Sequence, residues 1–179
     1  HIDLSRVVVA YARSRKPSAY GLQAALTPLR FEGGSRYTTR RGRRWSVQRV
    51  LDGHGREMLY ILTFYLPRFL DTSYQEKLTT IFHELWHVSP EFDGDIRRHE
   101  GRCYAHTSSQ DKYDRAMWVM AKKWLSLDPP AGLHAFLQCD FRELTKRWGH
   151  IHGTRVTAPK LYPVAAGATD EDAFRGRTA

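Results

Sequence analysis

The pattern of apolar and polar residues in the N-terminal part of the chain predicts β-strands. A run rich in β-branched residues at 2–13 indicates a strand or an amphipathic entry segment. Two further apolar segments, 45–51 and 58–66, flank the residues Asp-Gly-His-Gly, which are a hairpin signal. Residues 22–31 are ambiguous because Pro28 interrupts them, and proline within a strand indicates an edge strand or a bulge.

A helix is predicted after these strands. The apolar residues that repeat at helical spacing and define its buried face are Leu78, Ile81, Phe82 and Leu85. Thr72 or Ser73 can cap its first turn, with Gln or Glu following at the positions of a capping box. Pro90 ends it, because proline cannot continue a helix.

Two more helices are predicted in the C-terminal part, at 110–125 and 133–148. One side of the first carries a stripe that is more typical of a protein core than of a cofactor site, made of Met117, Met120, Ala121 and Trp124. Gly149 ends the second helix.

The composition is that of a globular domain. The chain has 179 residues, of which 41% are hydrophobic and 12% aromatic, which predicts one domain over 1–163 with a flexible C-terminal tail over 164–179. No apolar run approaches the roughly 20 residues of a membrane helix, so no membrane contact is expected. Two cysteines make no disulfide framework, and we therefore expect a cytoplasmic protein.

The first predicted helix carries the sequence His83-Glu84-Leu85-Trp86-His87, an HExxH motif. Side chains four residues apart lie on one face of a helix, so His83 and His87 can offer two imidazole nitrogens to one metal ion. Glu84 lies beside them and can take a proton from a water on that metal. The motif is short enough to occur by chance. Its amphipathic helix, its proline stop and a His-rich segment after it favour a zinc site.

A catalytic zinc needs a third protein ligand and an open position for water. The candidates after the helix are Asp93, Asp95, His99, Glu100 and His106. Asp93 has the position of the third ligand in the pattern HExxHxxGxxH/D, but Pro90 stands near the place where that pattern needs a turn glycine. Gly94 is the more suitable point of reversal, and it would let the chain return so that His99 faces the metal.

The residues HELWHVSPEFDGDIRRH resemble the signature of a family of small metallopeptidases predicted in archaea, bacteria and phage, similar in site logic to the SprT-like zinc proteases. The matching positions are His83, Glu84, Leu85, His87, Phe92, Gly94, Arg97 and His99, followed by Gly101 and Tyr104. Glu100 and the position of Pro90 depart from the signature. The resemblance covers about 59–125.

The resemblance implies a zincin-type catalytic core in which His83, His87 and His99 bind zinc. It favours a strand at 22–31. It also implies that the strand at 58–66, just before the active-site helix, lies beside the cleft. An edge of this sheet would then pair with an extended substrate chain.

Arginines crowd the segment 33–49 together with Tyr37 and Trp45; they are Arg36, Arg40, Arg41, Arg43, Arg44 and Arg49. Guanidinium groups suit phosphates and aromatic rings suit bases, and a net charge of +9 favours polyanion affinity. The residues predicted to bind DNA or another polyanion are Arg40, Arg41, Arg43 and Arg44. The alternative interpretation of this segment is a solvated hairpin tip.

Together these features predict an α+β, zincin-like zinc metallopeptidase that cleaves a protein or peptide substrate. Glu84 would be the general base and then protonate the leaving amine. The oxyanion would be bound by a donor from Tyr104, His106 or Tyr113, with Tyr104 preferred. A carboxylate of Asp93 or Asp95 would orient a ligand imidazole.

Two other classes stay open. One is a non-catalytic, zinc-stabilised nucleic-acid-binding module, in which His106 closes the site as a fourth ligand. Glu84 favours catalysis over this class, because a structural zinc site has no need of a base. The other is a toxin or defence protease with one protein target, which shares the chemistry and differs only in its substrate.

Overall fold

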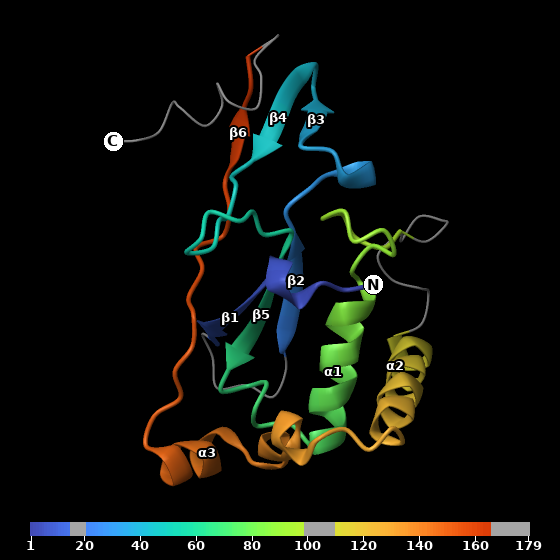
Figure 1. Ribbon diagram of the computed structural model, residues 1–179, viewed down its shortest axis with the longest axis vertical. Helices are drawn as coiled ribbons and strands as arrows, with labels where there is room; N and C mark the ends of the chain where they lie inside the picture. Colours follow the sequence, from blue (N-terminus) through green and yellow to red (C-terminus); the bar gives the residue numbers. More distant parts are fainter. Residues whose placement is uncertain (15–20, 99–109, 166–179) are drawn as a thin grey trace.

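The computed structural model describes residues 1–14, 21–98 and 110–165, which form two small sheets with helices beside them (Figure 1). The strands are β1 (Val7–Arg13), β2 (Ala24–Pro28), β3 (Tyr37–Arg40), β4 (Arg43–Val47), β5 (Tyr60–Leu66) and β6 (Leu161–Pro163). The α-helices are α1 (Tyr74–Trp86), α2 (Gln110–Leu125) and α3 (Phe141–Trp148), and 3-10 turns occur at Leu4–Arg6, Glu32–Gly34, Ala131–Leu133 and Ala135–Gln138. The predicted α+β class is confirmed.

The first sheet has the order β1-β5-β2, with β1 parallel and β2 antiparallel to β5. The strands predicted within 2–13 and 22–31 are confirmed. Pro28 is the last residue of β2, which is an edge strand, as its proline indicated. The central strand β5 supplies much of the core, because Tyr60 and its two successors are buried. β5 is paired on both sides, and the strand that lines the cavity beside the helix is β2 instead of the predicted strand before the helix.

The second sheet has the order β3-β4-β6. The predicted pairing between 45–51 and 58–66 is wrong, since β4 pairs with β3 on one side and β6 on the other. The β3–β4 hairpin closes through Arg41 and Gly42, whose φ angles are 51° and 71°. Two-residue hairpin turns of this kind need positive φ at both central residues. Arg41 takes this conformation although its type gives no such signal.

The predicted turn at 52–55 does form, but it does not join two strands of one sheet. Its Asp52 carboxylate accepts the backbone N–H groups of His54 and Arg56. Beyond it, one antiparallel bridge joins Leu51 to Glu57. The turn therefore carries the chain from the second sheet back to the first.

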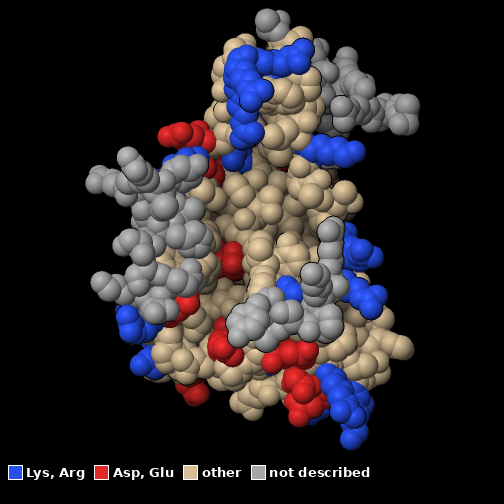
Figure 2. Space-filling view, turned by 180° about the vertical axis from the view of Figure 1, so that it is seen from behind, with Lys and Arg blue, Asp and Glu red and all other residues tan. Residues whose placement is uncertain are grey.

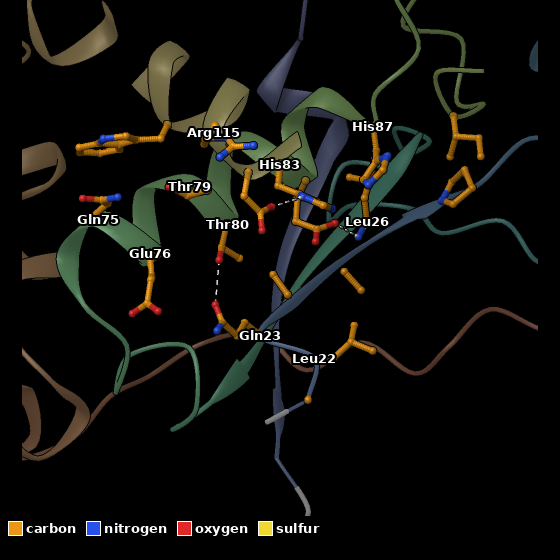
Figure 3. Close-up of a pocket in the computed structure, with 18 residues that line it drawn as sticks. Leu22, Gln23, Leu26, Gln75, Glu76, Thr79, Thr80, His83, His87 and Arg115 are labelled. Carbon is orange, nitrogen blue, oxygen red and sulfur yellow. Dashed lines mark hydrogen bonds and ion pairs between the residues drawn. The ribbon is translucent and has the colours of Figure 1, made fainter. Parts of the chain in front are cut away.

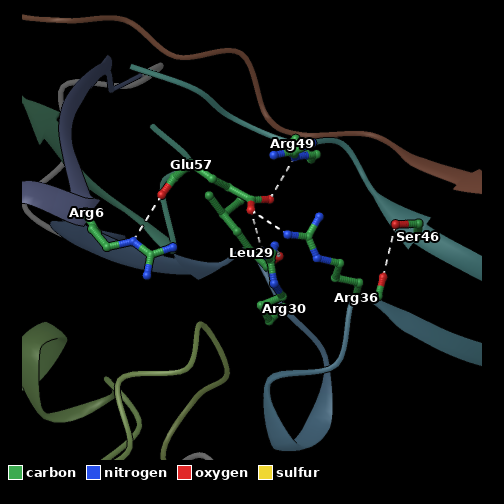
Figure 4. A network of polar contacts seen from close by, with 7 residues as sticks. All are labelled: Arg6, Leu29, Arg30, Arg36, Ser46, Arg49 and Glu57. Carbon is green, nitrogen blue, oxygen red and sulfur yellow. Dashed lines mark hydrogen bonds and ion pairs between the residues drawn. The ribbon is translucent and has the colours of Figure 1, made fainter. Parts of the chain in front are cut away.

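A network of charged side chains around Glu57 lies between the two sheets (Figure 4). The carboxylate accepts from Arg30 after β2 at 2.8 Å, Arg36 before β3 at 2.9 Å and Arg49 after β4 at 3.1 Å. The side chains of Arg30 and Glu57 are only 8% and 9% exposed. Burial would raise the pKa of Glu57, but Arg30, Arg36 and Arg49 outweigh it and hold that pKa below its ordinary value. Two arginines of the Arg-rich segment, Arg36 and Arg49, are thus engaged inside the molecule.

Helix α1 begins as predicted, at Ser73. The Ser73 hydroxyl accepts from the Glu76 N–H and the Glu76 carboxylate accepts from the Ser73 N–H, which is a complete capping box. Lys77 follows and is 1% exposed, and its ammonium donates to the carbonyls of Leu137 and Cys139. The ammonium ties the start of α1 to the chain after α2.

The helix predicted over 133–148 is wrong in its first half. The chain forms 3-10 turns there, and α3 starts only after Asp140, which makes a second capping box with Glu143. The carbonyls of Leu137 and Cys139 are taken by Lys77, which favours the break. Gly149 ends α3 as predicted, with a φ of 77°.

Helix α2 has the predicted bounds, and its buried stripe extends one turn earlier than predicted. Tyr113, Met117 and Ala121 are buried, while Met120 is 36% exposed and packs less than predicted. The core cluster that includes Leu78 and Ala121 joins α1 to α2. Within the described residues, no helix has the length and apolar character required to cross a membrane.

Candidate active site

A cavity of about 860 Å³ lies between the edge strand β2 and the helices α1 and α2 (Figure 3). The segment from Gly21 to Leu26 forms one wall. Helix α1 contributes His83, Glu84 and His87 to it. Helix α2 contributes Asp114, Arg115 and Trp118. The HExxH motif therefore faces a space bordered by a sheet edge.

The two histidines lie together as the spacing predicts. The ring centroids of His83 and His87 are 4.8 Å apart, with the rings edge to face. His87 is the C-cap residue of α1, so the pair occupies the last turn of the helix. Their side chains point into the same cavity from one helix face (Figure 3).

Glu84 is 8% exposed and is held by the edge strand. Its Oε2 accepts a hydrogen bond from the backbone N–H of Leu26 at 2.7 Å. Burial raises the pKa of Glu84 to about 7, although the Leu26 N–H acts in the opposite direction. A carboxyl group with this pKa can both take and return a proton near neutral pH.

Tyr113 from α2 borders the histidine pair. Its ring centroid lies 4.8 Å from that of His83 and 6.2 Å from that of His87, on which it stacks. Burial raises the pKa of Tyr113 to about 12, and the charge of Glu84 adds to this effect. The phenol therefore keeps its proton at neutral pH and can donate a hydrogen bond.

Asp114 is a site residue that the sequence analysis missed. Its Oδ1 lies 3.8 Å from Nδ1 of His83, longer than a hydrogen bond but close enough for the charges to interact. The signal that could have found Asp114 is the apolar stripe of α2. Extending that stripe by one turn from Met117 leads to Tyr113, and Asp114 follows it.

The chain after α1 reverses as expected. Gly94 has a φ of 91°, and a Cβ there would lie 2.5 Å from the side chain of Arg30. Val88 and Ile96 then form an antiparallel bridge. Arg97 donates its backbone N–H to the carbonyl of His87 at 2.7 Å. The predicted reversal at Gly94 is thus confirmed, and it brings the chain back to the end of the HExxH motif.

The two aspartates of this loop hydrogen-bond to the loop itself and to the Glu32–Gly34 turn. Asp93 accepts the N–H of Asp95 at 3.0 Å. The Asp95 carboxylate accepts the N–H of Gly33 at 3.1 Å and pairs with Arg98 at 2.9 Å. The carboxylate beside His83 belongs to Asp114 instead of either predicted residue.

Four predicted positions, His99, Glu100, Tyr104 and His106, lie outside the described residues. Within 1–14, 21–98 and 110–165, no three His, Cys, Asp or Glu side chains are grouped so that they could hold a metal ion. The third ligand and the role of Tyr104 therefore stay predictions. The four arginines predicted to bind nucleic acid lie on the β3–β4 hairpin and do not line this cavity.

Comparisons of the chain with protein-family models, with curated proteins and with solved structures give no match.

Proposed function

We propose that the chain is a zinc-dependent metallopeptidase with a zincin-like core. The observation that carries this proposal is the placement of Glu84, a buried carboxylate between two histidines that face one cavity. A helical histidine pair that arose by chance would need neither a buried acid beside it nor a cavity in front of it. Burial of a carboxylate is costly, and it is typical of sites where the group has a chemical task.

Among the described residues, the side chains that would bind the metal are of a type that suits zinc. Imidazole nitrogens are common zinc ligands, and the rings of His83 and His87 are adjacent. We propose His99 as the third ligand. Arg97 is bound to the carbonyl of His87, and the two residues from 97 to 99 span at most about 7 Å of chain. His99 is therefore within reach of the same site.

Zinc bound there would polarise the scissile carbonyl and lower the pKa of a coordinated water. Glu84 would take the proton of the attacking water and pass it to the leaving amine. Leu26 would hold one carboxylate oxygen, which leaves the other for the water. The protonated hydroxyl of Tyr113, one of the three donors considered from the sequence, would donate to the developing oxyanion in place of the preferred Tyr104.

The substrate would be an extended peptide. No described strand pairs with the outer edge of β2, which lines the cavity, although its Leu26 N–H is taken by Glu84. A peptide that lies on this edge would pass in front of Glu84 and the histidine pair. This retains the predicted binding at an edge of the sheet and proposes β2 as that edge.

The test uses Glu84→Gln, which keeps the size of the side chain and removes its basicity. We expect zinc content equal to that of the parent and hydrolysis of an unfolded protein reduced by about a thousandfold or more. The matched control is Glu91→Gln, an exposed residue in the loop after α1, which should leave both unchanged. Equal hydrolysis by Glu84→Gln and the parent would remove Glu84 from the mechanism. Zinc held by four protein ligands would instead support the non-catalytic binding module.

A further inference from the structure

The β3–β4 hairpin carries a basic surface that the proposed peptidase chemistry does not use. The register pairs Arg40 with Arg43 and Thr38 with Trp45. Side chains alternate between the two faces of a strand and paired residues share a face. Arg40, Arg43 and Trp45 therefore lie on one face of the hairpin.

The fourth predicted arginine lies on the opposite face. Arg44 shares that face with Tyr37, and its guanidinium stacks over the Tyr37 ring at 3.6 Å. The four arginines, which the sequence suggested as one group, are thus divided by the pleat of β4. Only three of them belong to a common surface.

The first face is concave. A cavity of about 650 Å³ is lined by Arg40, Arg41, Arg43, Trp45 and Leu161, which together are named the hairpin face. Leu161 comes from β6, the other neighbour of β4. Figure 2 shows Lys and Arg gathered at the end of the molecule that this hairpin forms.

The charge of the hairpin face is not neutralised locally. Arg40, Arg41 and Arg43 are exposed, and none of the three forms an ion pair with a described residue. The segments that build it, 33–51 and 153–165, contain no Asp or Glu. In contrast, the nearby Arg36 and Arg49 are neutralised by Glu57. The three exposed guanidinium groups are therefore available to an external anion.

We propose that the hairpin face binds single-stranded nucleic acid. Three guanidinium groups suit the phosphates of one strand, and the Trp45 ring on the same concave face suits stacking of a base. A duplex keeps its base faces stacked inside, so it offers nothing to the indole ring. The arrangement of cations around an aromatic ring favours a single strand over a duplex.

The experiment measures the affinity of the whole chain for a labelled single-stranded DNA by fluorescence anisotropy, as a function of salt. Arg40→Ala/Arg43→Ala removes two charges from the hairpin face. The matched control, Arg142→Ala/Lys146→Ala, removes two exposed charges from α3, at the opposite end of the molecule (Figure 1). Thermal unfolding of both variants checks that they remain folded.

We expect the hairpin variant to bind about tenfold more weakly or worse near 0.15 M salt, with the salt slope reduced by about 1.4, as for two lost contacts on a single strand. The α3 variant should change affinity less than about twofold. Equal weakening by both variants would show general attraction to a basic protein and overturn the proposal. So would a parent that does not bind at this salt concentration.

Two further variants separate the contributions of the face. Arg44→Ala removes one charge from the opposite side of the same hairpin and should weaken binding less than Arg43→Ala does. Trp45→Ala should lower the affinity for single-stranded DNA. The affinity for duplex DNA, which we expect to be the weaker of the two in the parent, should stay unchanged. Parent binding to duplex that equals its binding to a single strand would overturn the assignment to single strands.

Discussion

The backbone N–H of Leu26 donates to Oε2 of Glu84 at 2.7 Å, which joins the free edge of β2 to the HExxH helix. Because this N–H is given to Glu84, it points away from β5. Pro28 lies two residues further on and shares this orientation, so β2 already tolerates a residue without an outward N–H. Glu84, the proposed general base, is therefore oriented by a backbone group that no side-chain substitution can remove, except replacement by proline.

Leu26→Pro should test this arrangement. It removes the outward N–H and leaves the bonds between β2 and β5 in place. We expect kcat to fall by about tenfold or more, with zinc content retained, because Glu84 loses the donor that fixes its position. The measurements are kcat, KM and bound zinc on a peptide substrate.

Leu26→Ala is the matched control, because it keeps the N–H and removes the side chain that packs against the core cluster around Leu62 and Val88. It should cost about 2 kcal/mol of stability and leave kcat near that of the parent. If Leu26→Ala lowers kcat as much as Leu26→Pro does, the hydrogen bond has no special role.

The pKa of Glu84 predicts how the stability of the chelator-treated, metal-free protein depends on pH. Burial raises the pKa of the folded carboxyl from 4.5 to about 7, so the folded state holds the proton more tightly than the unfolded state. This tighter proton binding stabilises the folded state. Its contribution is complete below the unfolded-state pKa of 4.5 and is lost as pH rises through about 7.

Glu84→Gln cannot lose a proton and should therefore be more stable than the parent at pH 8, by about 3 kcal/mol. At pH 4 the ionisation of Glu84 should cause little difference between the free energies of unfolding of the two proteins. Urea unfolding of both at each pH measures the difference, with the exposed Glu91→Gln as the control. A difference between parent and Glu84→Gln that does not depend on pH would contradict the raised pKa.

The Glu57 network should contribute strongly to the stability of the two sheets. Glu57→Gln leaves Arg30, Arg36 and Arg49 without their shared carboxylate, and Arg30 is only 8% exposed. We expect a loss of about 3 kcal/mol in urea unfolding near neutral pH. The pKa of Glu57 is lower in the folded state than its ordinary value. The difference in stability between the parent and Glu57→Gln should therefore persist above the unfolded-state pKa and shrink as pH falls through the folded-state pKa.

Asp52→Asn is a suitable control for this experiment. Asp52 pairs with Arg56 on the surface, and an asparagine can still accept the backbone N–H groups of the turn. Its cost should be below about 1 kcal/mol, as for other exposed pairs. Equal losses for Glu57→Gln and Asp52→Asn would mean that the network adds nothing beyond an ordinary surface pair.

The parts of the fold that local chemistry determines were predictable from the sequence. The capping box at Ser73 and the proline at position 28 identified the start of α1 and an edge strand. The hairpin within 33–49 was predicted only as an alternative and its turn was not located, because Arg41 has no intrinsic preference for positive φ while Asp-Gly at 52 does. The three-residue strand β6 has no pattern of its own, and its pairing with β4 depends on the tertiary fold.

In the candidate site, too, some relationships between residues were predictable from the sequence and others depend on tertiary packing. His83, Glu84 and His87 lie on one helix, so their relation follows from helical spacing. Tyr113 and Asp114 come from another helix, and only the packing of α1 against α2 brings them to the pair. The N–H of Leu26 is a backbone group, for which a sequence carries no residue-type signal.

The proposal that His99 is the third ligand of a bound zinc ion can be tested directly. His99→Ala should lose most of its zinc at neutral pH, measured by elemental analysis after desalting, because two imidazoles alone hold zinc weakly. Asp93→Ala should keep its zinc and lose some stability, because the Asp93 carboxylate accepts the N–H of Asp95 within the loop. Arg97 reaches the carbonyl of His87 through its backbone, so the chain is already directed to the site two residues before His99. Loss of zinc in Asp93→Ala together with retention in His99→Ala would reverse the assignment and make Asp93 the ligand.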